Sequence, residues 1–179
     1  MDYLITGLPR SRTAWLANYL TVGSSFCYHE GLKDCFDIGD LRMMKKAPYT
    51  GNSDSSAVFF IDEMKSLFPD MKIVVIDRNY QDVLNSLEKD YAGPYTRYLV
   101  AATKTSKEYT QSHYPHLLVK FKDINRRLDE ITEYCIPSEE ITESRKKMLL
   151  DLKVEVSKNS YEKVGVLVKD KLKELLAYA

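Results

Sequence analysis

Short apolar runs alternate along the chain with longer segments in which apolar residues recur every three or four positions. Short runs are typical of buried strands, and the longer spacing is typical of helices with one apolar face. The expected strands cover residues 2–6, 25–29, 72–77 and 117–121. The expected helices cover residues 13–21, 57–68, 80–89, 94–112 and 125–135. This order predicts an α/β fold, with a largely parallel sheet flanked by helices.

Three further segments complete the chain. Residues 31–48 mix acidic and basic side chains, and we expect an irregular segment or a short helix there, over the functional site. Residues 51–54 have the composition of a turn, and Asp54 is expected to cap the helix that follows. The region 138–179 is expected to be charged helix that packs one apolar face. That face consists of Val164, Leu167, Val168, Leu172, Leu175 and Leu176.

Composition narrows the class of protein. The 179 residues suit a single domain over 1–179, and Lys+Arg and Asp+Glu both total 26, which argues against nucleic acid or a membrane as partner. No apolar run approaches the roughly 20 residues of a membrane span. The first strand begins almost at once, leaving no room for a signal peptide. Cys27, Cys35 and Cys135 lack metal-type spacing, so we expect free thiols, no metal and a cytoplasmic location.

The loop after the first strand has the chemistry of an anion site. It carries, in order, Gly7, Pro9, Arg10, Ser11, Arg12 and Thr13. A strand, a tight loop and a helix N-terminus direct backbone N–H groups and the positive end of the helix dipole at one point. The arginines add charge and the hydroxyls add donors, so the expected ligand is a phosphate or sulfate group. An ATP-type loop would need a second Gly followed by Lys, and both are missing.

Residues 9–16 resemble the 5′-phosphosulfate loop of the sulfotransferase family, Pro-(Lys/Arg)-Ser-Gly-Thr-Thr-Trp-Leu. They read Pro9-Arg10-Ser11-Arg12-Thr13-Ala14-Trp15-Leu16, a match at six of eight positions. Arg12 replaces the family's Gly, which costs backbone freedom if that position needs a positive φ. Ala14 replaces a Thr and removes one hydroxyl donor.

Residues 72–86 resemble the family's 3′-phosphate motif. An apolar strand ends at Arg78, Asn79 and Asp82 follow in the motif's register, and Ser86 lies eight positions after the arginine. Tyr80 replaces the usual Pro. A guanidinium fork suits a dianionic phosphate.

The resemblance extends beyond these two motifs. Residues 117–124 are similar to the later family strand that ends in Tyr-Glu-Asp-Leu. Over residues 1–137 the chain is therefore identified as a small member of the sulfotransferase family, with a P-loop NTPase-like architecture. The helical region 138–179 lies outside the match.

The resemblance implies a donor, 3′-phosphoadenosine 5′-phosphosulfate (PAPS), and roles at its 5′ end. Arg10 would neutralise the leaving group. Ser11, Thr13 and Ala14 would hold the 5′-phosphate through hydroxyl and backbone N–H groups, and the Arg12 side chain would add an anion contact.

The resemblance also implies residues that contact the adenine ring, the 3′-phosphate and the acceptor. Trp15 would lie against adenine, and Arg78 and Ser86 would bind the 3′-phosphate. Sulfuryl transfer by in-line displacement also needs a base for the acceptor. Glu30 is the first candidate and His29 the second, since both follow the second expected strand, where protein-tyrosine and some bacterial sulfotransferases carry a catalytic Glu.

Several alternatives stay open. The acceptor, a hydroxyl or an amine, belongs to a small molecule, a glycan or a peptide, and its site is either open or completed by a second subunit of a homo-oligomer. The family's late Arg-Lys-Gly loop has no counterpart, although Arg145-Lys146-Lys147 is a basic run in a similar part of the chain. A P-loop small-molecule kinase, or a non-catalytic descendant that binds a nucleotide or a partner, would also fit parts of the pattern.

Overall fold

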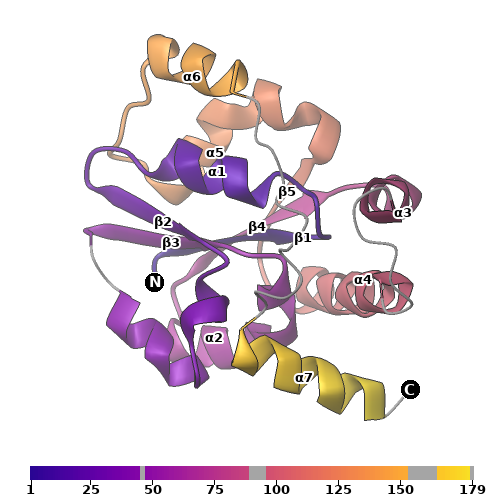
Figure 1. Cartoon of the computed structure of the whole chain (residues 1–179). Coiled ribbons are helices and arrows are strands. Elements are labelled where there is room, and N and C mark those ends of the chain that lie inside the picture. Colours follow the sequence, from indigo (N-terminus) through magenta and orange to yellow (C-terminus); the bar gives the residue numbers. More distant parts are fainter. Residues whose placement is uncertain (45–46, 89–95, 153–164, 178–179) are drawn as a thin grey trace.

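The computed structural model describes residues 1–44, 47–88, 96–152 and 165–177 (Figure 1). Its centre is a five-stranded parallel sheet in the order β2-β3-β1-β4-β5. The strands are β1 (Tyr3–Gly7), β2 (Ser25–His29), β3 (Tyr49–Ser53), β4 (Lys72–Asp77) and β5 (Leu117–Lys120). The predicted α/β fold with a largely parallel sheet is confirmed.

Helices cover both faces of the sheet. The α-helices are α1 (Thr13–Leu20), α2 (Ile61–Leu67), α3 (Tyr80–Glu88), α4 (Thr96–His113), α5 (Leu128–Cys135), α6 (Glu143–Leu150) and α7 (Val166–Ala177). Short 3-10 helices are η1 (Gly31–Asp34), η2 (Ile38–Met44), η3 (Ser56–Phe60) and η4 (Phe121–Arg127). In Figure 1, α1, α5 and α6 lie on one face, and α2, α4 and α7 lie on the other. Residues 94 and 95 of the predicted fourth helix lie outside the described residues.

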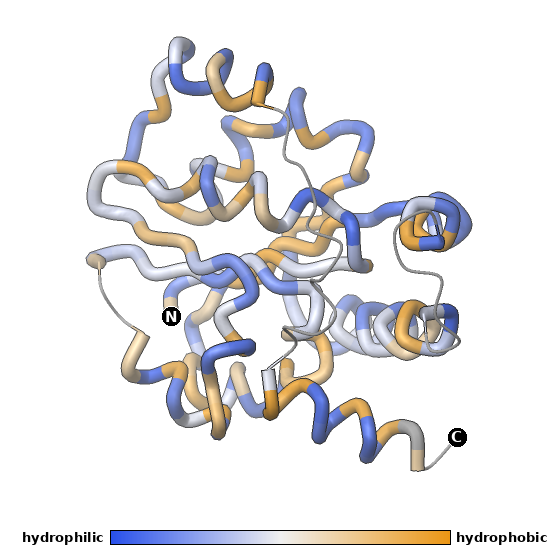
Figure 2. The backbone as a smooth tube through the Cα atoms, viewed as in Figure 1, coloured by the Kyte–Doolittle hydropathy of each residue, from blue (hydrophilic) through white to orange (hydrophobic). Residues whose placement is uncertain are grey.

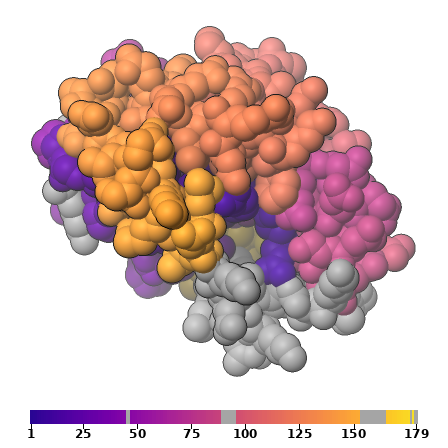
Figure 3. Space-filling model, turned by 90° about the horizontal axis from the view of Figure 1, so that it is seen from above, coloured from indigo at the N-terminus to yellow at the C-terminus, as the bar shows by residue number. Residues whose placement is uncertain are grey.

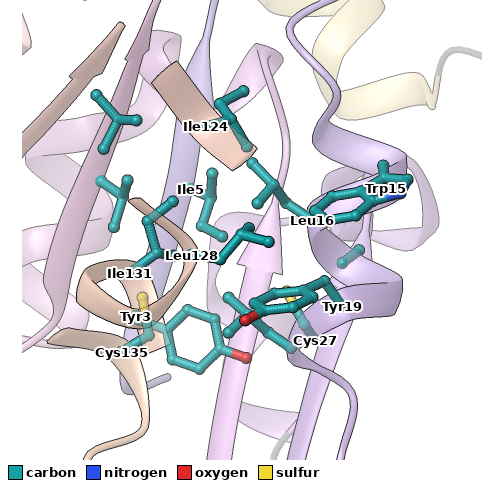
Figure 4. Close-up of a cluster of buried hydrophobic side chains, with 14 of the residues drawn as sticks. Tyr3, Ile5, Trp15, Leu16, Tyr19, Cys27, Ile124, Leu128, Ile131 and Cys135 are labelled. Atoms are coloured by element: carbon teal, nitrogen blue, oxygen red, sulfur yellow. The ribbon is translucent and has the colours of Figure 1, made fainter. Parts of the chain in front are cut away.

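Each face of the sheet has its own apolar core. One core joins β1 and β4 to α1 and α5, and Figure 4 shows Tyr3, Leu16 and Ile131 within it. The other core lies between the opposite sheet face and α2, η3 and α7. The helices alternate between hydrophobic and hydrophilic residues along their length, as expected for helices that pack one side (Figure 2).

The sequence prediction was wrong about residues 51–53, which were expected to lie in a turn. They form the C-terminal part of β3, which lies between β2 and β1 in the sheet. Gly51 lies under the Tyr3 ring, where an added Cβ would stand 2.0 Å from a ring carbon. The missing side chain therefore makes room for a fully buried tyrosine, whose hydroxyl is hydrogen-bonded to Ser25 at 3.1 Å.

We expect Gly51→Ala to destabilise the protein by about 2 kcal/mol, because a methyl group would collide with the buried Tyr3 ring. Urea denaturation of the variant and of the parent protein measures this difference in the free energy of unfolding. Gly39→Ala is the control, because an added Cβ there meets only the flexible Asp37 side chain. Equal stability of the two variants would contradict the close packing of β3 against Tyr3.

The C-terminal region is not one helix either, since α6 and α7 lie on opposite faces of the sheet (Figure 1). α6 packs on α1, where Trp15 Nε1 donates to the Leu149 carbonyl at 2.7 Å. Val168 of α7 is buried in the second core, with Leu167, Leu172 and Leu175 against it, so the predicted apolar face of this helix is confirmed there. Val164 lies outside the described residues.

All three cysteines are free and buried. Burial raises the pKa of Cys27 to about 12 and, with help from nearby aspartates, that of Cys35 to about 11. Near neutral pH these two thiols are therefore protonated and poor nucleophiles. Of the described helices, none is long and apolar enough to span a membrane.

Candidate functional site

The phosphate-type loop leaves the carboxyl end of β1 and leads into α1. Gly7 ends the strand, and an added Cβ there would lie 2.5 Å from the Ile76 carbonyl oxygen of β4. The first helical hydrogen bond of α1 runs from Leu16 N–H to the Arg12 carbonyl at 2.9 Å. The backbone N–H groups of Thr13, Ala14 and Trp15 precede this ladder and lack a partner within the helix. They form the positive end of α1.

Two arginines of this loop have left-handed backbones, with φ of 66° at Arg10 and 63° at Arg12. Non-glycine residues adopt this conformation at a cost of roughly 1–2 kcal/mol each. Arg12 does have a positive φ, so the condition under which replacing the family's Gly costs backbone freedom is met. Backbone strain of this kind concentrates at functional sites.

Ser11 is fully buried between these arginines, and its hydroxyl has no hydrogen-bond partner among the described residues. A buried polar atom without a partner costs about 1–3 kcal/mol. An anion in the loop would supply an acceptor for it, so the residues fit the phosphate or sulfate group expected there.

The 3′-phosphate motif meets the loop at the carboxyl end of β4. Arg78 donates a hydrogen bond to the backbone carbonyl of Arg10. Arg10 Nε in turn approaches the hydroxyl of Ser86, on α3, at 3.4 Å. The two motifs, 68 residues apart at these arginines, thus form one cluster.

Two neighbours complete this cluster. Asn79 caps α3, since its side-chain oxygen accepts from the N–H groups of Gln81 at 2.8 Å and Asp82 at 3.2 Å. The guanidinium of Arg78 lies 4.2 Å from the Phe121 ring centroid, in η4. Burial lowers the pKa of Arg78, as does the charge of Arg10, while Asp82 acts against this shift. Such a cluster favours a bound anion.

Arg12 and Trp15 differ from the prediction. Trp15 is only 4% exposed, and its ring is stacked on Tyr19 with the centroids 5.3 Å apart (Figure 4). The Arg12 guanidinium lies 4.4 Å from the centroid of the same indole and donates to Asn125 Oδ1 at 2.6 Å. In this structure the Trp15 indole therefore belongs to the core and has no free face for the predicted contact with adenine.

The candidate bases lie two strands away from the loop. His29 ends β2 and Glu30 follows, with His29 Nε2 and Glu30 Oε1 3.6 Å apart and the side chains 35% and 49% exposed. Glu30 has a φ of 55° and donates its backbone N–H to the Ser53 carbonyl of β3 at 3.1 Å. Because parallel strands lie about 4.8 Å apart, the ends of β2 and β1 are separated by roughly 10 Å. The pair shares the carboxyl edge of the sheet with the arginine cluster.

Asp54, at the carboxyl end of β3, is a cap as predicted. Its carboxylate accepts from the Ser56 N–H at 2.8 Å and hydroxyl at 2.6 Å, at the start of η3, and from the Leu32 N–H at 3.3 Å. Asp54 is 1% exposed, and its carboxylate is already hydrogen-bonded to other groups of the protein.

In the basic run on α6, Arg145 and Lys146 are engaged by other parts of the protein. Arg145 donates to the Asn18 and Thr21 carbonyls at 3.0 and 2.7 Å, at the C-terminal end of α1. Lys146 pairs with Asp129 at 2.5 Å and with Glu143 at 2.6 Å. These contacts fasten α6 to α1 and α5.

Sequence reasoning missed Phe121 and Asn125, which hold Arg78 and Arg12 from η4. Both residues follow β5, and residues that follow parallel strands gather at one edge of the sheet. That rule could have indicated them.

Figure 3 shows indigo atoms of the N-terminal segment in a recess between the orange segment that includes α6 and the magenta segment that includes α3.

No protein-family model matches the sequence, and no curated protein matches it either. Solved structures do match, and they show that the fold of this chain is that of the sulfotransferases. Mouse sulfotransferase SULT7A1, complexed with PAP, is similar with a TM-score of 0.56 and 15% identity, over 83% of this chain. A sulfotransferase from Alicyclobacillus acidocaldarius is similar with a TM-score of 0.54 and 14% identity. The match covers 83% of this chain and 89% of the bacterial one. The chain spans only 62% of the mouse protein's length.

Proposed function

We propose that this protein transfers a sulfuryl group from PAPS to a hydroxyl or amine acceptor. The observation that carries the proposal is the cluster in which Arg10, Arg78 and Ser86 meet. Arg10 belongs to the motif that resembles the family's 5′-phosphosulfate loop, whereas Arg78 and Ser86 belong to the motif that resembles its 3′-phosphate site. A nucleotide with phosphates at both positions would engage both halves of the cluster at once.

The chemistry of the site supports an anionic donor. Two arginines with left-handed backbones, a third at the end of β4, and the N-terminus of α1 provide positive charge. The unpartnered Ser11 hydroxyl provides a donor. The similar mouse sulfotransferase is complexed with PAP, adenosine 3′,5′-bisphosphate, the product that PAPS leaves after transfer.

Each residue then has a step in the reaction. Arg10 neutralises the charge that develops on the bridging oxygen as its bond to sulfur breaks. Ser11, Thr13 and the N-terminus of α1 hold the 5′-phosphate, and Arg78 holds the 3′-phosphate with Ser86. The acceptor oxygen or nitrogen forms the new bond to sulfur from the opposite side.

Glu30, or His29, takes the proton that the acceptor loses. PAP leaves with the charge that Arg10 has stabilised. The acceptor class, whether small molecule, glycan or peptide, stays a prediction, and so do homo-oligomer formation and a cytoplasmic location.

A kinase function is less well supported, because the loop lacks the Gly-Lys pair of an ATP-type loop. The carboxylate at the end of β3, the strand next to β1, belongs to Asp54. It already accepts three hydrogen bonds from the protein.

A non-catalytic descendant has specific support in Arg12 and Trp15. Arg12 stands where the family has Gly, and Trp15 is buried. Such a protein would bind PAP without turning PAPS over. Turnover of PAPS in the presence of candidate acceptors therefore separates it from an active transferase.

Calorimetric titration with PAP, with ATP–Mg²⁺ and with adenosine 5′-phosphate tests the proposed donor site. We expect selective micromolar binding of PAP, and a tenfold to hundredfold loss of affinity in Arg78→Ala, since a charge-assisted hydrogen bond contributes about 1.5–3 kcal/mol. Arg97→Ala is the charge-matched control, because Arg97 is a surface residue paired with Glu88 at 2.8 Å. Preferential binding of ATP–Mg²⁺, or no binding at all, would overturn the proposal.

A further inference from the structure

The burial of Trp15 leaves the base of a bound nucleotide without its expected aromatic partner. The indole is 4% exposed and its N–H is occupied by the Leu149 carbonyl. The side chain that lies over this ring is Arg12, with the guanidinium carbon 4.4 Å from the ring centroid. A planar guanidinium can itself stack on an aromatic base.

We propose that Arg12 is the platform on which the adenine ring of the nucleotide stacks, and that Asn125 positions it. This inference rests on the proposed function, because it concerns the base of the same nucleotide. Arg12 would thus be a binding residue that replaces the Trp15 indole, and Asn125 a positioning residue that acts through Arg12.

Two contacts and the backbone conformation hold the Arg12 side chain in place. Its Nη1 donates to Asn125 Oδ1 at 2.6 Å, which fixes the end of the side chain. The Trp15 ring supports the guanidinium from the core side. The left-handed backbone, with φ of 63°, sets the direction in which the side chain leaves the loop. A side chain held at both ends loses little conformational freedom when a ligand arrives.

The position of Arg12 also fits the rest of the nucleotide. Asn125, its partner, belongs to η4, and η4 also carries Phe121, which lies 4.2 Å from the guanidinium of Arg78. The arginine proposed for the base and the arginine proposed for the 3′-phosphate are therefore both held by this one short helix. Partial burial lowers the pKa of Arg12.

Fluorescence gives a direct test, because Trp15 is the single tryptophan of the chain. We expect wild-type protein saturated with PAP to keep most of its emission, since Arg12 separates the indole from the base. In Arg12→Gly, which adopts the same backbone without strain, the base reaches the indole and PAP quenches the emission strongly. Strong quenching in the wild type, at a concentration that saturates the site by calorimetry, would overturn the inference.

Affinity gives a second test, with a probe that lacks a base. Arg12→Leu keeps a side chain over Trp15 but removes the cationic plane. We expect it to bind PAP about tenfold more weakly, in line with a partly desolvated cation–π contact, and to bind an abasic ribose 3,5-bisphosphate as the wild type does. Asn125→Ala should show a smaller loss, also confined to PAP.

Arg126→Leu is the matched control, since Arg126 is a neighbouring arginine on η4 that pairs with Asp123. Equal losses for PAP and for the abasic probe in Arg12→Leu would mean that Arg12 contacts phosphate, which overturns the platform and leaves the proposed function intact. Failure of wild-type protein to bind PAP would overturn both.

Discussion

Arg10→Gly is expected to lower the turnover of PAPS by about 10²–10³-fold, the typical cost of removing one group that stabilises charge in a transition state. Arg10 comes from the loop between β1 and α1, and its Nε lies 3.4 Å from Ser86 Oγ at the other half of the cluster. In the proposed site this side chain would therefore lie between the two phosphate positions of the donor. Initial rates with saturating PAPS and a phenolic or amine acceptor measure the effect.

Glycine is the substitution of choice at this position because the Arg10 backbone has a φ of 66°. Glycine adopts that conformation without strain, so the loop keeps its path while the guanidinium is lost. Arg10→Lys should restore part of the rate, since lysine is the family's alternative at this position. A rate close to that of the wild type in Arg10→Gly would show that leaving-group charge is stabilised elsewhere in the site.

The motifs indicated Arg10, Arg78 and Ser86, which meet in the structure, because each motif is local in sequence. Arg78 follows the apolar strand β4 and Ser86 lies about two turns into α3, so their spacing alone predicts that both bind one phosphate. The phosphate contact itself stays a prediction. Their contact with Arg10 follows because β1 and β4 are neighbouring parallel strands, whose carboxyl ends share an edge.

The surroundings of Trp15 could not be predicted in the same way. Its indole N–H bonds to Leu149, 134 residues later, and Arg12 is held by Asn125, 113 residues later. Neither partner follows from the loop's own sequence. A motif identifies the residue types at a site, whereas the packing of distant helices decides which of those side chains faces a ligand.

β3 was missed for a related reason. Its residues, with Gly51, Asn52 and Ser53 in succession, have the composition of a turn. In the sheet, however, Gly51 is needed beside the Tyr3 ring and Asn52 Oδ1 accepts from the Gly31 N–H at 3.0 Å. These requirements come from neighbouring strands and loops, so local propensity gave the wrong element.

Glu30→Gln is expected to lower turnover by about 10²–10⁴-fold, the range that a positioned general base contributes. Gln keeps the size and the hydrogen-bonding ability of the side chain but cannot take a proton from the acceptor. The affinity for PAP should stay unchanged, because β3 separates Glu30 from the loop after β1. Initial rates give the turnover, and calorimetric titration of the same preparation with PAP gives the affinity.

The geometry of the pair explains why His29 must be tested beside Glu30. The two side chains lie 3.6 Å apart and both are partly exposed, so either can reach an acceptor over the end of β2. If Glu30 is the base, Glu30→Gln loses most of the turnover and His29→Ala keeps most of it. If His29 is the base, His29→Ala shows the larger loss. Asp34→Asn, an exposed acid in η1, controls for the loss of one negative charge nearby. Full turnover in both variants, with PAP still bound, would mean that another group takes the proton and would overturn the assignment of the base to the end of β2.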